Sequence, residues 1–375
     1  MTFPLKNSAY VIIIILCLFM AACGCLQGIP GLTPPVTYPV IVPVKGGAMP
    51  PVPVYQFMFQ DRSGTLTAGV DPGVYAGAQN AEKSARIYDD KIGEPEWLAG
   101  IYLAMIRDPA QDDFYNDLMS RTRQEKAGAS LDDDEYLEYL AVFVQSIPYE
   151  SLNLTDPKFP VETFVDGKGD CDDKSMLLAG ILSREGYRVA LLYFEPELHM
   201  AVGVDCGDAG YKNSGYGFIE TTNISYVGVE PDILTGGVVL ESEPLVFPVG
   251  NGTKTYTRCN ETRTIHDAQE VIKQELSGME SEIDLMADRL ETMKTGIQET
   301  ENEMDSLLAG GRVREYNIMV MDFNEKVSTY NAQLRGYRDR VAEYNSRAEL
   351  YNYILTHAYD RKGTYERVRS GYPQA

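Results

Sequence analysis

Two heptad repeats in the last third of the chain constrain its fold more than any other feature. The later repeat places aromatic side chains every seven residues and aliphatic ones at the complementary offset: Tyr316, Phe323, Tyr330, Tyr337, Tyr344 and Tyr351, with Val320, Val327, Leu334, Val341, Ala348 and Leu355. The earlier repeat runs through Ile272, Leu276, Met279, Ile283, Met286, Leu290, Met293, Ile297, Met304 and Leu307, with Thr300 as its one polar member. This 3-4 spacing predicts helices that pack along a seam.

The break between the repeats predicts how the two helices are arranged. Ala309-Gly310-Gly311 separates them, and glycine interrupts a helix. We therefore expect an antiparallel coiled-coil hairpin over residues 262–360, followed by a tail, 361–375. Each arm has about 45 residues, or roughly 65 Å at 1.5 Å per residue. The aromatic stripe is interpreted as seam packing rather than a ligand surface. Such an arm spaces or oligomerises, so self-association through it is an expected interaction.

The N-terminus predicts the compartment. Lys6 precedes an uncharged, largely apolar run from Ala9 to Cys23. The run is short for a membrane span, which needs about 20 residues, but fits the apolar part of a signal peptide. Ala21-Ala22 before Cys23 resembles a prokaryotic lipobox, so residues 1–23 are interpreted as a signal peptide with a lipidated cysteine. An uncleaved signal anchor and ordinary cleavage are the alternatives. All three interpretations predict an exported chain, and the lipid anchor places it at the outer face of the cell membrane.

The part before the repeats divides into three further regions. Residues 24–54 contain spaced prolines, which predict an extended linker outside any core. Residues 55–130 are expected to form a β-hairpin turning around Arg62-Ser63-Gly64 and helices over 73–89, 95–107 and 111–126. A fourth helix is expected from the acidic Leu131-Asp132-Asp133-Asp134 to Pro148, and opens a core over 131–255.

Charge excludes one class of partner. With 33 Lys and Arg against 55 Asp and Glu, the formal charge is −22. Binding a phosphate backbone requires clustered basic side chains, so the composition excludes a nucleic-acid binder. Residues 260–375 carry 15 basic and 21 acidic side chains, which leaves −16 on residues 1–259. That front part is also a poor partner for an anionic membrane surface.

The cysteines are unequally placed along the chain. Cys17, Cys23 and Cys25 fall in or next to the N-terminal segment, which leaves Cys171, Cys206 and Cys259. An odd number in an oxidising compartment leaves at least one thiol free or paired with another molecule. Cys206 and Cys259 could form a disulfide and leave Cys171 free; three unpaired thiols are the alternative.

The sequence around Cys171 suits a nucleophile. Gly167-Lys168-Gly169-Asp170 reads as a turn, and Asp170 as the N-cap of a helix that starts at Cys171. The free amides and the helix dipole there stabilise a thiolate. The flanking Asp170, Asp172 and Asp173 oppose this effect, so a positively charged partner is needed.

Three strands are predicted after this helix, the first over residues 187–194, and the second and third supply a base and an acid. The second of them starts at His199, with Ala201 and Gly203 on the histidine's face, and these small neighbours would leave room for the cysteine helix. A following strand, 216–222, carries Glu220. If it pairs beside the histidine strand, Glu220 can accept the second imidazole N–H and orient the ring. Cysteine, histidine and acid in this order are typical of thiol catalysis.

The stretch GKGDCDDKSMLLAGILSREGYRVALL, followed by HMAVGV and GFIETT, resembles the core of bacterial and archaeal transglutaminase-like cysteine peptidases. The preceding VFVQSIPY resembles the segment that leads into that core, and the resemblance covers about residues 131–230. It implies an α+β fold with the cysteine helix packed on an antiparallel sheet. It also implies Cys171 as nucleophile, His199 as general base and then acid, and Glu220 as the orienting carboxylate.

Two departures from the family pattern bear on the activity. The third member is usually aspartate, and the histidine is usually followed by Ala-Trp rather than by Met200-Ala201. The only tryptophan is Trp97. Without a tryptophan beside the site, the pattern favours hydrolysis over amine transfer.

Taken together, the residues predict an exported, lipid-anchored thiol hydrolase that acts on peptide or carboxamide bonds of a protein or peptide. An amine-transferring crosslinking enzyme and a non-catalytic envelope module that associates through its arm are the alternatives. No cofactor or metal is expected, because the Asp172-Asp173 pair is interpreted as charge at a helix N-terminus. His266 and His357 are assigned no role.

Overall fold

The computed structural model describes residues 36–88, 91–150, 156–207, 210–231, 234–235 and 237–371. The predicted signal peptide and lipobox, with Cys17, Cys23 and Cys25, lie outside the described residues, as does the first part of the predicted linker. Within the described ranges, no helix is both long enough and apolar enough to cross a lipid bilayer.

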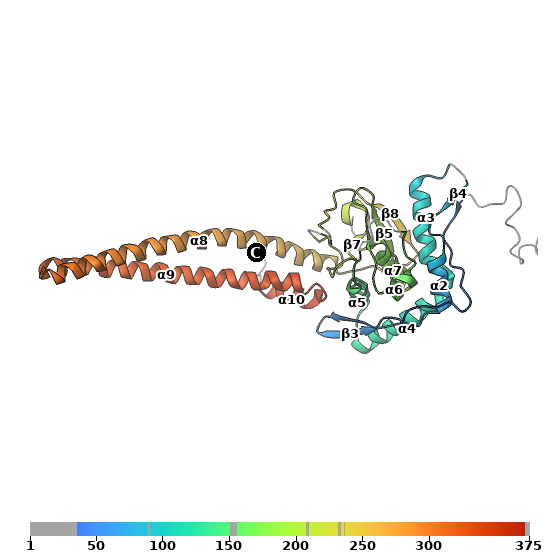
Figure 1. Ribbon diagram of the computed structural model, residues 1–375, viewed down its shortest axis with the longest axis horizontal. Helices are drawn as coiled ribbons and strands as arrows, with labels where there is room; N and C mark the ends of the chain where they lie inside the picture. Colours follow the sequence, from blue (N-terminus) through green and yellow to red (C-terminus); the bar gives the residue numbers. More distant parts are fainter. Residues whose placement is uncertain are drawn as a thin grey trace, which may run out of the picture.

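The chain folds into a mixed α+β globule from which a long helical arm projects (Figure 1). This confirms the α+β class. A four-stranded antiparallel sheet in the order β7-β6-β5-β8 lies in the globule. Its strands are β5 Val189–Phe194, β6 His199–Val204, β7 Gly217–Ile219 and β8 Leu245–Val249. The last went unpredicted; it contains Pro248, which a strand tolerates here because β8 lies at the edge of the sheet.

Helix α7, Cys171–Arg184, packs on one face of this sheet. Its apolar side chains, such as Leu178, share a core with Met200 and Val202 of β6. A smaller cluster covers the opposite face of the sheet and consists of Leu192, Phe194, Ala201, Phe218, Leu234 and Leu240. Both faces of β6 are therefore buried, which leaves only its ends accessible to a substrate.

The N-terminal part of the globule is helical, as expected, with one correction. Its helices are α2 Pro72–Asn80, α3 Glu94–Arg107, α4 Asp112–Ala129, α5 Asp133–Ser146 and α6 Pro160–Asp166, with a short 3-10 turn η1 Pro109–Gln111. The helix expected over 73–89 ends at Asn80, and Arg86–Ile87 forms a strand, β4, instead. Pairing with strand β1, Val36–Thr37, and a buried ion pair between Lys83 and Glu162 hold this part extended.

The hairpin expected over 55–70 is present, with its turn displaced. Strands β2, Tyr55–Phe59, and β3, Arg62–Leu66, pair in antiparallel register. The chain reverses at Gln60-Asp61, two residues before the predicted turn. Gln60 adopts the turn conformation with a positive φ of 53°. Glutamine is not a typical turn residue, so the sequence did not indicate the turn at this position.

The predicted linker is the second correction. Residues 36–54 are extended and largely irregular but pack on the globule. Ile41 is 4% exposed, and its amide donates to Asp108 Oδ2 at 2.7 Å. The Val44 amide donates to the carbonyl oxygen of Gly73 at 2.9 Å. Within this segment Val36–Thr37 alone joins a sheet. Proline lacks an amide donor, but the other amides and the apolar side chains still have partners in the fold.

The arm consists of two long helices that run in opposite directions (Figure 1). They are α8, Cys259–Ala309, and α9, Val313–Thr356. The turn between them contains Gly311, whose φ of 72° favours glycine. At 1.5 Å per residue, α8 is about 75 Å long. The helices and their turn lie where the heptad pattern places them, and coiled-coil supercoiling stays a prediction.

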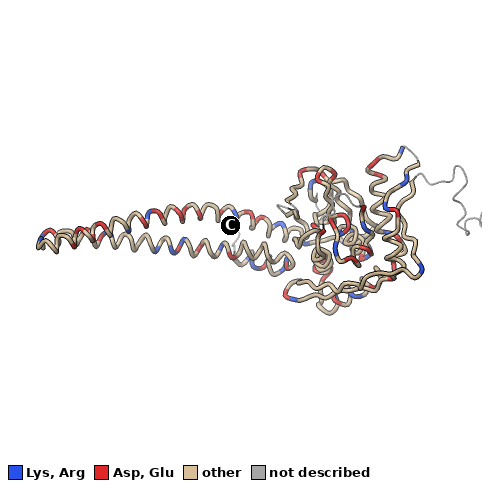
Figure 2. Tube along the Cα trace, in the orientation of Figure 1, with Lys and Arg blue, Asp and Glu red and all other residues tan. Residues whose placement is uncertain are grey.

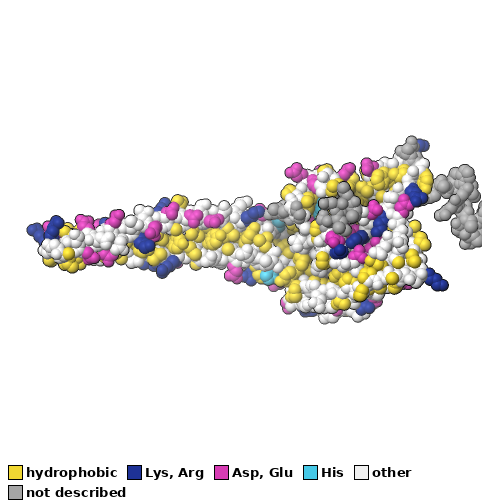
Figure 3. Space-filling view, in the orientation of Figure 1, with side chains coloured by type: hydrophobic (Ala, Val, Ile, Leu, Met, Phe, Trp, Pro, Cys, Tyr) yellow, Lys and Arg dark blue, Asp and Glu magenta, His cyan; other side chains and the backbone are white. Residues whose placement is uncertain are grey.

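Side chains of the heptad seam are the more buried ones along the arm. In α8 the buried members include Ile272, Met279, Leu290, Met304 and Leu307, whereas the α9 members from Tyr316 to Tyr351 are half-buried. Charged side chains lie along both helices (Figure 2), and α8 alone carries thirteen acidic against four basic residues. An apolar band follows the visible face of the arm (Figure 3).

A disulfide and a buried ion-pair cluster are among the contacts that join the base of the arm to the globule. A disulfide joins Cys206, which follows β6, to Cys259, the first residue of α8, which is one of the two arrangements that the sequence left open. The predicted tail forms a helix through residue 371, α10 Arg361–Gly371, which packs on the arm. Arg361 is buried and pairs with Glu138 of α5 at 2.5 Å and with Glu261 of α8. A buried arginine with two carboxylate partners explains why this end of the chain is ordered as a helix.

Candidate active site

Cys171 is the first residue of α7 and the free cysteine of the described residues. Asp170 caps the helix as predicted: its side chain accepts from the Asp173 amide, and the Asp173 side chain accepts from the Asp170 amide. This capping box fixes where the helix begins, and so fixes the backbone position of the cysteine. The thiol is half-buried.

His199 and Glu220 form the buried hydrogen-bonded pair that the sequence suggested. His199 Nε2 lies 3.2 Å from Glu220 Oε2, and the two side chains are 8% and 1% exposed. The other carboxylate oxygen accepts from the Thr222 amide at 2.6 Å and from the Thr222 hydroxyl at 2.5 Å. Glu220 directly follows β7, which pairs with β6 as expected.

The tautomer of His199 follows from this bond. Burial raises the pKa of the Glu220 carboxyl, but hydrogen bonds from His199 and Thr222 outweigh burial and hold the pKa below its usual value. The ionised carboxylate can only accept, so Nε2 carries the proton in this bond. The other ring nitrogen, Nδ1, is left as the basic atom.

The sulfur of Cys171 lies against the start of β6. It is 3.8 Å from the carbonyl oxygen of Leu198 and also interacts with the amide of Met200; these two residues flank His199 in the sequence. Across the described chain, no hydrogen bond joins this sulfur to the imidazole. The three predicted residues are thus brought to one end of β6, with a direct bond between only two of them.

The face on which α7 approaches is a correction. The helix was expected on the face of His199, Ala201 and Gly203, but it packs on the face of Met200 and Val202. The space beside Gly203 is filled instead by Tyr216 and Leu192. The larger aliphatic side chains bury more apolar surface under a helix than alanine and glycine do, which decides the face. Cys171 lies against the start of β6 because it stands at the end of the helix, beside the end of the strand.

Burial and the neighbouring carboxylates keep the thiol of Cys171 protonated. Burial is the largest cause that raises the pKa of this thiol, followed by Asp172, while the Met200 amide acts in the opposite direction. Burial also raises the pKa of Asp172 well above its usual value and that of Asp173 to about 7. The dipole of α7 therefore does not produce a thiolate by itself, and a base is needed.

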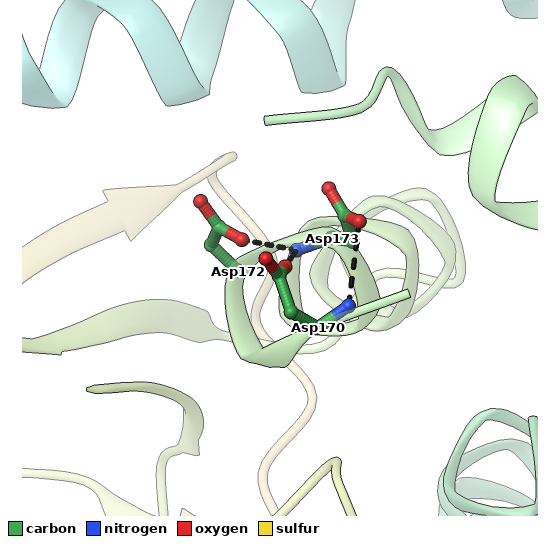
Figure 4. Close-up of side chains that lie close together, drawn as sticks. All are labelled: Asp170, Asp172 and Asp173. Carbon is green, nitrogen blue, oxygen red and sulfur yellow. Dashed lines mark hydrogen bonds between the residues drawn. The ribbon is translucent and has the colours of Figure 1, made fainter. Parts of the chain in front are cut away.

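Three aspartates gather at the start of α7 (Figure 4). The carboxylates of Asp170, Asp172 and Asp173 offer oxygens that all lie within 4.8 Å of one another. Their oxygens accept hydrogen bonds from backbone amides: the Asp173 amide donates to Asp172 Oδ1 at 2.9 Å, and the Lys158 amide donates to Asp173 Oδ1 at 2.6 Å. These bonds connect the aspartate cluster to the start of α7 and to residue 158 before α6.

Two buried polar residues near the site were missed by sequence reasoning. Lys174 is fully buried in α7, where its ammonium donates to the carbonyl oxygens of Gln145 at 3.2 Å and Ile147 at 2.5 Å. Burial lowers the pKa of Lys174 to about 7. Gln145, near the end of α5, donates to the carbonyl oxygen of Glu220 at 2.7 Å. The available signal was a polar side chain inside an otherwise apolar helical stretch.

A hollow of about 560 Å³ lies elsewhere, at the junction of globule and arm. It is lined by both disulfide cysteines, Tyr211, Glu230 and His266, among others, and by none of the three predicted site residues. A hollow by itself does not identify a site, so the chemistry of the side chains is the better guide here.

No family model, no curated protein and no solved structure matches this chain.

Proposed function

We propose that the protein is a thiol hydrolase with a transglutaminase-like core, in which Cys171, His199 and Glu220 cleave a peptide or carboxamide bond. The observation that carries the proposal is a buried His199–Glu220 pair at the end of β6, beside a free cysteine at a helix N-terminus. In uncomplexed enzymes, catalytic hydrogen bonds are often long and tighten when substrate binds. The reaction requires a rotation of the cysteine or histidine side chain that brings the sulfur to Nδ1.

The reaction balances over two half-reactions. His199 Nδ1 takes the proton of the Cys171 thiol as the sulfur attacks the carbonyl carbon, and amides at the start of α7 donate to the oxyanion. The imidazolium then protonates the leaving amine or ammonia, and the carbon–nitrogen bond breaks to leave a thioester. Water loses a proton to His199, attacks the thioester and releases the carboxylic acid. The sulfur recovers the proton.

The experiment uses an acyl donor that does not depend on knowing the natural substrate. The full chain is mixed with p-nitrophenyl acetate, and the burst of p-nitrophenolate is recorded together with acetylation of the Cys171 peptide by mass spectrometry. We expect a burst close to one equivalent, its loss in Cys171→Ala, and a fall of about 10²-fold or more in its rate in His199→Gln. A burst that survives in Cys171→Ala contradicts the proposal.

A peptide carboxamide then separates hydrolysis from amine transfer. Release of ammonia without incorporation of a labelled amine supports the hydrolase, and incorporation of the amine supports the crosslinking enzyme. The predicted export and N-terminal anchoring are tested by cell fractionation and by the mass of the N-terminal peptide, where a lipid on Cys23 is expected.

A specific observation favours a second candidate, a non-catalytic envelope module that associates through its arm. The Cys171 sulfur lacks a bond to the imidazole in the described structure, and burial and Asp172 raise the pKa of its thiol. A folded protein whose Cys171 alkylates no faster than a small thiol at pH 8, in the absence of any burst, supports this module against the hydrolase.

A further inference from the structure

The segment from Glu220 to Tyr226, here called the acid segment, connects the candidate catalytic acid to the base of the arm. It follows β7 and contains no helix or strand. Without a ladder of backbone hydrogen bonds, its position depends on contacts made by individual side chains. Among these contacts, Gln145 links the segment to α5 and Tyr226 links it to the arm.

Gln145 of α5 forms hydrogen bonds with the acid segment at Glu220 and at Ser225. Its side-chain nitrogen donates to the carbonyl oxygens of Glu220 at 2.7 Å and Ser225 at 3.1 Å, and its side-chain oxygen accepts from the Ser225 amide at 3.4 Å. Gln145 is 3% exposed. Its own carbonyl oxygen accepts from the buried Lys174. One buried amide side chain therefore joins both ends of a six-residue loop to the end of α5.

Tyr226 is the last residue of the acid segment, and its hydroxyl contacts residues of the arm and of α10. The Tyr226 hydroxyl donates to the carbonyl oxygen of Ile354 in α9 at 2.8 Å and lies 3.3 Å from the Thr364 hydroxyl of α10. The ring packs in the cluster that Ile265, Ile272, Leu350 and Ile354 form at the base of the arm. The acid segment is thus clamped between α5 and the arm.

We propose that Gln145 and Tyr226 are positioning residues for Glu220, and that the base of the arm, through Tyr226, holds this acid against His199. This inference rests on the proposed function for its catalytic consequence. Glu220 must keep a 3.2 Å contact with His199 Nε2 for the ring to present Nδ1 to the sulfur. Displacement of about 1 Å in a catalytic geometry can lower a rate by 10².

The test compares Gln145→Met and Tyr226→Phe with a matched control, Tyr187→Phe. Tyr187 is likewise buried, and its hydroxyl donates to a backbone carbonyl, that of Asp133 at 2.6 Å, away from the acid segment. Each full-length variant is acylated with p-nitrophenyl acetate, which gives the burst amplitude and the burst rate. Hydrogen–deuterium exchange of the peptide covering 217–227 is measured on the same samples.

We expect about a tenfold lower burst rate with an unchanged amplitude in Gln145→Met and Tyr226→Phe, and faster exchange in the 217–227 peptide. Tyr187→Phe should keep the wild-type rate and exchange in that peptide. A merely structural role would instead reduce the amplitude, which counts folded sites, at an unchanged rate. Should Gln145→Met fail to fold, Tyr226→Phe carries the test by itself.

The outcomes separate the two proposals. Wild-type burst rates in Tyr226→Phe, or equal losses in Tyr187→Phe, overturn the positioning role and leave the hydrolase standing. Absence of any burst in the wild type overturns the hydrolase, and the exchange measurement then decides the clamp alone. Unchanged exchange across 217–227 in Tyr226→Phe overturns the clamp in either case.

Discussion

At Cys171, burial and the nearby carboxylates oppose the helix dipole and raise the pKa of the thiol. A helix N-terminus contributes typically 0.3–1 kcal/mol to a nearby anion. Burial of the thiol and the carboxylate of Asp172 both act against ionisation, and the pKa of the thiol is raised as a result. The resting site therefore contains a neutral thiol, and proton transfer to His199 belongs to the attack itself.

The pH dependence of Cys171 alkylation tests this balance. We expect the rate with iodoacetamide, read at the Cys171 peptide, to keep rising above pH 9, because the raised pKa keeps the thiol protonated below that pH. Asp172→Asn removes a negative charge and should shift the profile to lower pH by about one unit. Asp61→Asn, at an exposed carboxylate, is the control. A plateau below pH 8 in the wild type contradicts the expectation.

Lys174 makes a second prediction, on stability. Burial lowers its pKa in the folded protein to about 7, whereas an unfolded lysine has a pKa near 10.4. Between these values the unfolded chain binds the additional proton, so this group's contribution to stability rises as pH increases from 7 to 10. Relative to Lys174→Met, the wild type should gain up to about 1.4 kcal/mol per pH unit in urea unfolding at pH 7, 8 and 9. Parallel pH dependence in the two proteins contradicts it.

Residues were predictable where a short motif determines their place. Asp170 caps α7, so Cys171 at its start could be found from adjacent residues alone. The pairing of His199 with Glu220 required only that two consecutive strands be neighbours. The bonding partners of Gln145 were not predictable, because they lie 75 and 80 residues away and a polar side chain in an apolar stretch does not indicate which groups it will bind.

Elements were predictable where periodicity extends over many residues. The arm helices and α7 follow their apolar patterns closely. The failures are short and depend on tertiary contacts: α2 ends at Asn80 because the following residues pair with β1, and residues 36–54 pack on the globule despite their prolines. Local propensity is a weak influence, and a few buried contacts override it.

The disulfide between Cys206 and Cys259 connects the end of β6 to α8 and should stabilise the folded protein. It closes a loop of 53 residues between the end of β6 and α8, with a Cα–Cα distance of 6.1 Å. Cross-links of this kind stabilise the folded state by about 2–4 kcal/mol, mainly by restricting the unfolded chain. Cys206→Ser with Cys259→Ser should lower the free energy of unfolding by that amount, measured in urea. Cys171→Ser is the control for loss of a thiol, and an equal loss there contradicts the assignment.

For the whole molecule, we expect the arm to mediate self-association. Ile318 and Met321, on the outside of α9, are 67% and 80% exposed, and an apolar band continues along the arm (Figure 3). Burial of such side chains between two copies is favourable by about 25 cal/mol per Å². We expect sedimentation velocity to show a dimer that is weakened by Ile318→Lys with Met321→Lys, at an unchanged helix content because both side chains are exposed. A wild-type monomer at 100 µM, a test concentration on the order of weak protein–protein affinities, rejects self-association.

By itself the sequence determined the elements whose signal is local or periodic: the two arm helices, the start of α7 at Cys171, and the class of the fold. Tertiary structure alone decided which face of β6 lies under α7, and that the acid segment is clamped by α5 and the arm. The physical reason is the range of the interactions. Helix periodicity and capping act over a few residues, whereas burial and hydrogen bonding between distant segments exist only once the chain is folded.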